Sequence, residues 1–132
     1  MSTMTEPKTP HEIWQQWLVR AEKHDMDWFD RVLSDEAVMQ DPVGNLLGKY
    51  EYMDRVRAVT DSIEFEHLSW KERVYGDISI GNGVYRGSAT LHHPDGRSEV
   101  MAYTAAFTFI CHKRERGWVV VSFAGTLIPP KS

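Results

Sequence analysis

Residues 38–44 (VMQDPVG) contain the side chain best suited to chemistry, the carboxylate of Asp41. Pro42 biases Asp41 toward extended backbone, and strand alternation puts Asp41 on the same face as Met39. If that face lines an apolar pocket, desolvation raises the pKa of the carboxyl group and suits Asp41 to be a general base. The alternative is a solvated turn aspartate, because Asp before Pro favours turns.

Two further residues are candidates for the group that works with Asp41. Tyr103 alternates with Ala105 and Phe107 along a predicted strand, so its hydroxyl can face the interior as a donor or general acid. His67 alternates with Phe65 on an earlier predicted strand, which can aim it inward. Each also has a structural interpretation, in which the tyrosine fills the core and the histidine lies on the surface or in the core.

We expect these groups to share an apolar, substrate-binding pocket. Trp17 lies on the apolar face of a predicted helix, where it packs in the core or offers its indole N–H to a ligand. Tyr85 has Gly83 and Gly87 on its own strand face, and these small residues leave room for a ligand or let the sheet bend. The predicted lining is Trp17, Met39, Asp41, Met53, Val56, Tyr85, Tyr103, Phe107 and Phe123.

Three predicted helices in the first half of the chain must position part of this pocket. Thr9 is a typical N-cap, and Glu12 stands where a capping box places its acid. The first helix runs to about residue 24, and a second, shorter helix starts with Asp27 as its cap. The run AVMQD is a short strand, and a third helix spans roughly residues 50–62.

The second half of the chain reads as strands. They cover residues 64–76, 78–93, 98–113 and 118–128 and are joined by the turn-like segments GD, HPDGR and RERG. Consecutive strands with tight turns predict an antiparallel meander, here a curved sheet wrapped around the three helices. The expected fold is therefore α+β and cone-shaped, with one open end. We expect a single domain over residues 9–132 after a disordered lead over residues 1–8.

Composition narrows the functional classes. The 132 residues carry a net charge of −4 and one cysteine, which favours neither nucleic acid nor an anionic membrane as a partner. No apolar stretch approaches the length of a membrane span, and we expect a cytoplasmic protein. No metal-ligand spacing and no Gly-rich phosphate loop is visible, so we expect no metal, nucleotide or flavin cofactor.

The order of these elements, the segment HDMDWFDRVLSDEAVMQDPVG and the closing RERGWVVVSFAG resemble one known superfamily. From about residue 9 to residue 128 the chain resembles the nuclear transport factor 2-like superfamily, and within it the ketosteroid isomerase and SnoaL-like branch. The resemblance implies that Asp41 is the base that shuttles a proton between substrate carbons. Two positions depart from the isomerases: Trp17 stands where they place a tyrosine oxyanion donor, and Ala105 stands where they place a protonated aspartate.

The leading functional expectation is a cofactor-free isomerase, a lyase such as a dehydratase, or a cyclase acting on a small apolar oxygenated molecule. Asp41 takes the proton, and Tyr103, His67 or Trp17 stabilises the oxyanion. The alternative is a ligand-binding or protein-interaction module without turnover, which the superfamily also contains. We also expect a homodimer through the outer sheet face, which carries Val119 and Val121 in the last strand.

Overall fold

The computed structural model describes residues 5–41, 44–58, 62–92 and 94–129. Its first helix, α1 (Pro10–Glu22), begins as predicted, because the Thr9 side chain accepts a hydrogen bond from the N–H of Glu12. The Glu12 carboxylate in turn accepts one from the N–H of Lys8. The backbone just before α1 is therefore hydrogen-bonded to the first helical turn.

The other two helices differ from the prediction at their ends. The helix α2 (Met26–Val32) is capped by Asp25, whose side chain accepts from the N–H of Trp28; the predicted cap, Asp27, was wrong. The helix α3 (Lys49–Arg57) ends before the predicted residue 62. Ser62 is already the first residue of a strand, because the extended pairing of the sheet continues further toward the helix than propensity indicates.

The strands form one six-stranded sheet in the order β2-β1-β6-β5-β4-β3. Its members are β1 (Leu33–Gln40), β2 (Leu46–Leu47), β3 (Ser62–Tyr75), β4 (Ile78–His92), β5 (Ser98–Arg114) and β6 (Gly117–Ile128). The predicted meander is β3 to β6. The strand β1, for which the sequence predicted no pairing partner, pairs in parallel with β6. That pairing satisfies the backbone edge that β6 would otherwise leave open.

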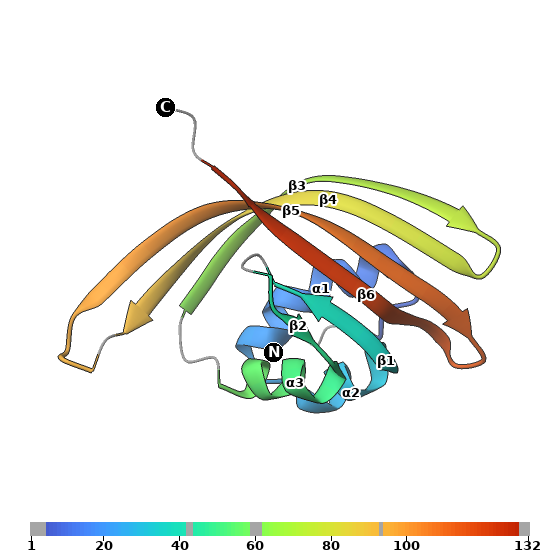
Figure 1. The fold of residues 1–132 in the computed structure, drawn as a ribbon, viewed down its shortest axis with the longest axis horizontal. Helices are drawn as coiled ribbons and strands as arrows, with labels where there is room; N and C mark the ends of the chain where they lie inside the picture. The colour runs from blue at the N-terminus through green and yellow to red at the C-terminus, as the bar shows by residue number, and fades with distance from the viewer. Residues whose placement is uncertain (1–4, 42–43, 59–61, 93, 130–132) are drawn as a thin grey trace.

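The sheet bends over the helices, which lie together on its concave side (Figure 1). The core between them is aromatic: Trp14, Trp17, Trp28, Phe29 and Phe109 are all nearly or fully inaccessible to solvent. The parallel pairing places Met39 of β1 beside Phe123 of β6. These two side chains belong to the part of the core that leads to the candidate site.

Glycines in β4 make room for rings from the neighbouring strand. A Cβ atom on Gly83 would overlap the ring of Phe107, and one on Gly87 would lie 2.6 Å from the Tyr103 hydroxyl. The space beside Tyr85 that the sequence left open to a ligand is therefore filled by Phe107 and Tyr103.

The N-terminal segment is attached to two helices. The side chain of Gln16 donates to the backbone oxygen of Thr5 at 2.8 Å, and Arg31 of α2 forms an ion pair with Glu6 at 3.0 Å. Of the lead that we expected to be disordered, residues 1–4 lie outside the described part of the chain, and residues 5–8 make these defined contacts. Among the described residues, no helix has the length and apolarity needed to cross a membrane.

A buried lysine fixes the start of α3. The Lys49 ammonium is 3.0 Å from the Asp30 carboxylate and 3.3 Å from that of Asp35, and it also donates to the Asp30 carbonyl at 2.9 Å. Burial alone lowers the pKa of Lys49, but the two carboxylates outweigh that effect and the pKa is raised. Lys49 thus joins the start of α3 to Asp30 of α2 and to Asp35 of β1.

Candidate ligand-binding pocket

A cavity of about 150 Å³ opens between β1, β2, β6 and α3. Its lining residues are Met39, Gln40, Asp41, Leu47, Tyr52, Arg55 and Phe123. We call this space the Tyr52 cavity. Three of the residues predicted from the sequence, Met39, Asp41 and Phe123, meet here, and the polar groups Tyr52 and Arg55 come from α3.

Asp41 lies at the end of β1 and combines both of its predicted interpretations. Its carboxylate lines the Tyr52 cavity and also accepts hydrogen bonds from the backbone N–H and the side-chain amide of Asn45, at 2.9 and 3.0 Å. Gly44, with φ of 95°, closes the turn by donating its N–H to the Asp41 carbonyl at 3.0 Å. Asp41 is therefore a turn residue whose side chain is held against a cavity wall.

Arg55 gives Asp41 a charged partner. One guanidinium nitrogen of Arg55 lies 2.7 Å from the Asp41 carboxylate, and 17% of the Asp41 side chain is exposed. The ion pair and the Asn45 hydrogen bonds all stabilise the ionised carboxylate. The prediction from the sequence considered only desolvation by apolar neighbours, because Arg55 and Asn45 were not recognised as neighbours of Asp41.

Tyr52 is the functional candidate that the sequence analysis missed. The indole N–H of Trp17 donates a 2.8 Å hydrogen bond to the Tyr52 hydroxyl oxygen. Burial raises the pKa of Tyr52 to about 12, despite the opposing effect of that hydrogen bond, so the phenol keeps its proton at neutral pH. Among the described residues none accepts a hydrogen bond from Tyr52, so the O–H is available to a molecule in the cavity.

Trp17 lies in the core behind Tyr52. Its side chain is only 2% exposed, and its ring meets Phe29, Tyr52 and Phe123. Of the two interpretations left open, the structure places Trp17 in the core, where its N–H fixes the Tyr52 hydroxyl. The predicted lining residues Met53, Val56 and Phe107 are likewise buried core residues.

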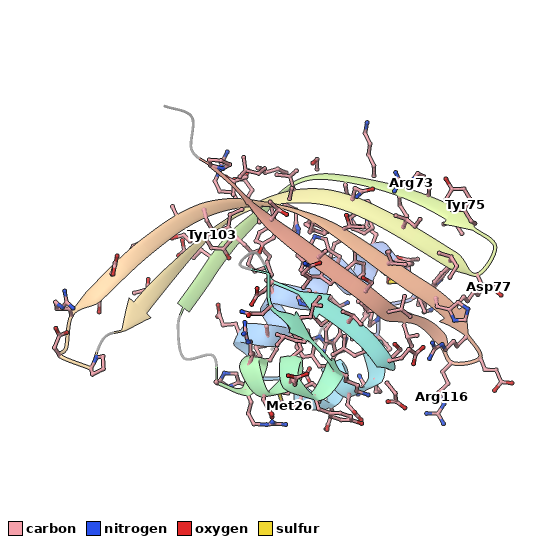
Figure 2. All side chains as sticks on the ribbon, in the orientation of Figure 1. Met26, Arg73, Tyr75, Asp77, Tyr103 and Arg116 are labelled. Atoms are coloured by element: carbon pink, nitrogen blue, oxygen red, sulfur yellow. The ribbon has the colours of Figure 1, made fainter. Side chains whose placement is uncertain are left out.

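Tyr85 of β4 and Tyr103 of β5 pack against each other on the sheet. Their ring centroids are 5.9 Å apart. Burial raises the pKa of Tyr85, with a further increase from the charge and the hydrogen bond of Tyr103 and a smaller one from Tyr52. Tyr103 lies on the inner face, as alternation predicted (Figure 2), but the Tyr52 cavity does not include it.

His67 lies on β3, away from Asp41. Its imidazole packs edge-on against Trp14 and Phe65, with ring centroids 5.8 and 5.3 Å apart. Partial burial, followed by the influence of His11, lowers its pKa. The residue is exposed on one side and is not part of the Tyr52 cavity.

The described residues contain no group of three or more His, Cys, Asp or Glu side chains arranged to hold a metal ion. The polar side chains that line the Tyr52 cavity are those of Gln40, Asp41, Tyr52 and Arg55. This set can orient one small polar function of a ligand.

Comparison with solved structures identifies the architecture. An NTF2-like protein of unknown function in nutrient uptake from Rhodospirillum rubrum superposes with a TM-score of 0.73 at 19% identity, over 92% of this chain and 99% of that one. A nuclear transport factor 2-like superfamily protein from Salmonella enterica serovar Typhimurium gives 0.70 at 15% identity, over 93% of each chain. The protein has the nuclear transport factor 2-like fold.

The predicted superfamily architecture is thus confirmed, and the ketosteroid isomerase and SnoaL-like branch stays a prediction. A third similar structure is the CaMKII hub of S. rosetta, with a TM-score of 0.74 at 15% identity over 96% of this chain and all of that one. No protein-family model and no curated protein matches the sequence. At these identities the likeness establishes the fold alone, and function has to be argued from the site.

Proposed function

We propose that the protein binds one small, mostly apolar molecule that carries a single oxygen acceptor, and that this molecule occupies the Tyr52 cavity. The observation that carries the proposal is the Trp17–Tyr52 hydrogen bond, which fixes a neutral hydroxyl at the cavity wall. The indole N–H binds one lone pair of the hydroxyl oxygen, and the O–H proton stays available to a ligand. A carbonyl or ether oxygen is the matching group.

The dimensions of the cavity support a ring-sized ligand. The cavity measures about 150 Å³, and an engineered apolar cavity of about this volume holds one benzene molecule. Met39, Leu47 and Phe123 supply apolar walls. A six-membered ring with one carbonyl group fits the size of the cavity and can accept a hydrogen bond from Tyr52.

A matched pair of probes tests the proposal. Cyclohex-2-enone and benzene are similar in size, and only the enone has an oxygen acceptor. We expect the enone to bind at least about tenfold more tightly than benzene in NMR titrations, and Tyr52→Phe to remove most of that difference. Tyr50→Phe is the control, because Tyr50 lies on the same helix but is 63% exposed. Equal binding of the two probes, or an unchanged preference in Tyr52→Phe, would contradict the proposal.

Proton transfer is the second candidate function, because Asp41 and Tyr52 line the same cavity. With cyclohex-3-enone, Asp41 takes a proton from the carbon between the carbonyl and the double bond. The oxygen of the resulting dienolate accepts a hydrogen bond from Tyr52, and Asp41 returns the proton to the far carbon of the former double bond, giving cyclohex-2-enone. Arg55 opposes this step, since its ion pair weakens Asp41 as a base.

The opposing effect of Arg55 makes the catalytic candidate testable apart from binding. Isomerisation of cyclohex-3-enone, followed by ultraviolet absorbance, should stop in Asp41→Asn and accelerate in Arg55→Gln. The control Arg57→Gln removes an exposed arginine of the same helix that pairs with Asp54. Binding of the enone without any Asp41-dependent turnover would leave the protein as a binding module, the alternative expected from the sequence.

We further propose a homodimer through the outer face of the sheet. Small side chains of β4, β5 and β6, including Val84, Ala106, Thr108, Ala124 and Thr126, line a shallow depression of about 440 Å³ there. This surface can take a second sheet without large rearrangement, and the hub named among the similar structures is consistent with a self-associating fold. Sedimentation of the wild-type protein should give twice the chain mass, and sedimentation of Ala106→Arg should give the mass of the monomer. A monomeric wild-type protein would contradict the proposed dimer.

A further inference from the structure

A second, larger cavity lies at the other end of β6 from the Tyr52 cavity. It measures about 510 Å³ and is enclosed by the N-terminal segment, α1, α2 and the turn between β5 and β6. We call it the Trp118 cavity. Trp118 lines it and Phe123 lines the Tyr52 cavity; five residues of strand separate the two side chains, which is roughly 16 Å.

The inner wall of the Trp118 cavity is apolar. Ile13 of α1 is 2% exposed and Val32 of α2 is 5% exposed, and Trp118 adds a half-buried indole. A volume of about 510 Å³ lies within the usual range for small-molecule sites, about 300–1,000 Å³. The wall therefore suits a flat hydrocarbon ring system that is larger than the Tyr52 cavity can hold.

The rim of the cavity is cationic. Lys8, Arg31 and Arg116 line it together with two acids, Glu6 and Asp30. Asp30 is paired with Lys49, and Glu6 is paired with Arg31. Within the described parts of the chain, neither Arg116 nor Lys8 makes an ion pair. The net charge at the rim is therefore positive, which favours an anionic ligand.

The ion pair between Glu6 and Arg31 shows how a carboxylate binds at this rim. The Arg31 guanidinium donates to both Glu6 oxygens, from Nε at 3.3 Å and from its terminal nitrogen at 3.0 Å. The Arg31 and Glu6 side chains are 52% and 62% exposed, and an exposed pair of this kind stabilises a protein little. A carboxylate from outside can therefore take the place of Glu6 at low cost.

We propose that the Trp118 cavity binds a small amphipathic anion, namely an aromatic or alicyclic carboxylate. The ring system packs on Trp118, Ile13 and Val32. The carboxylate binds the guanidinium groups of Arg31 and Arg116 and displaces Glu6. Both the chemical class of this ligand and its position on the fold differ from those of the molecule assigned to the Tyr52 cavity.

The probe for this site is 2-naphthoate, and 2-naphthamide is its neutral counterpart of nearly the same shape. In titrations of the whole chain followed by amide NMR, 2-naphthoate should shift Val32, Gly117, Trp118 and Val119 and bind at least about tenfold more tightly than the amide. Arg31→Gln and Arg116→Gln should each weaken naphthoate binding about tenfold. Glu6→Gln, by removing the internal competitor, should tighten it about threefold.

Matched controls come from an ion pair on the outer surface of the sheet. Arg86 and Glu66 are 61% and 65% exposed and lie 3.4 Å apart, so Arg86→Gln and Glu66→Gln should leave naphthoate binding unchanged. Any of three results would overturn the proposal: no naphthoate binding, equal binding of naphthoate and naphthamide, or unchanged affinity in both Arg31→Gln and Arg116→Gln. Shifts confined to Asp41 and Tyr52 would also overturn it, because they would place the ligand in the other cavity.

Discussion

The indole N–H of Trp17 on α1 donates a 2.8 Å hydrogen bond to the hydroxyl oxygen of Tyr52 on α3. This bond joins a fully packed core residue to a residue that lines the Tyr52 cavity. It satisfies the indole N–H, which would be costly to bury without a partner. It also orients the Tyr52 hydroxyl group, whose proton can then be donated to a ligand.

The first prediction follows from the buried state of Tyr52. Burial raises the pKa of Tyr52 from 10.0 to about 12, so above pH 10 the unfolded chain releases this proton while the folded protein retains it. The free energy of unfolding should therefore fall as the pH rises through this range. Tyr52→Phe should lose less stability than the wild type between about pH 9 and about pH 11 in urea unfolding. Equal losses in both proteins would show that Tyr52 ionises freely.

The second prediction concerns the stability of Asp41→Asn. Because Asp41 makes an ion pair with Arg55 and two hydrogen bonds with Asn45, its replacement should lower the free energy of unfolding at neutral pH. We expect about 1 kcal/mol, with the ion pair contributing a minor share because Arg55 is half exposed. Chemical denaturation measures the change.

Asp54→Asn is the control for Asp41→Asn, because Asp54 forms an exposed ion pair with Arg57 on the same helix. It should cost less than about 0.5 kcal/mol. If Asp41→Asn stabilised the protein instead, desolvation would outweigh the contacts of the carboxylate. The apolar neighbours of Asp41 in the sequence, taken without Arg55, favour that outcome.

The third prediction uses His67. Its pKa is lowered from 6.5 by burial and, second, by His11, so on acidification the unfolded chain takes up a proton before the folded protein does. Well above pH 6.5 the ionisation of His67 does not affect the free energy of unfolding. As the pH falls below 6.5, the free energy of unfolding decreases, because the unfolded chain binds the proton more readily. His67→Gln should therefore lose less stability than the wild type between about pH 7.5 and about pH 5.5. His11→Gln, which removes the second cause, should reduce the loss in part; identical slopes in all three proteins would contradict the prediction.

The fourth prediction tests the close approach of Phe107 to Gly83. A Cβ at Gly83 would overlap the Phe107 ring and lie 2.9 Å from the Ser69 carbonyl. Gly83→Ala should therefore cost about 2 kcal/mol, a typical penalty for overpacking. Gly48→Ala is the control, since its nearest contact would be an ordinary 3.5 Å, and it should cost less than about 1 kcal/mol. Similar melting temperatures for the two variants would argue against the packing described.

The sequence predicted those parts of the fold that depend on local signals. The Thr9 cap, the four long strands and the inward alternation of Met39 and Asp41 are each decided by neighbouring residues. The cap of α2 was ambiguous because Asp25 and Asp27 both precede Trp28. The parallel pairing of β1 with β6 joins segments about eighty residues apart, and no local pattern encodes such a partner.

The candidate site was predicted only in part for the same reason. Asp41 was found through its flanking proline and glycine, but its partner Arg55 lies on another element and its contact is tertiary. Tyr52 carried a usable signal: it stands four residues before Val56, on the same side of α3. The buried Trp17 also required a hydrogen-bond partner. Considered together, these two facts would have pointed to the Trp17–Tyr52 pair.

The most direct test of the central claim is the infrared carbonyl stretch of ¹³C-labelled cyclohex-2-enone bound to the protein. A hydrogen bond from Tyr52 should lower the stretching frequency relative to the enone in an apolar solvent. The shift should persist in Tyr50→Phe and disappear in Tyr52→Phe. A bound enone whose frequency equals that in the apolar solvent, or whose shift survives Tyr52→Phe, would contradict the role assigned to the Tyr52 hydroxyl.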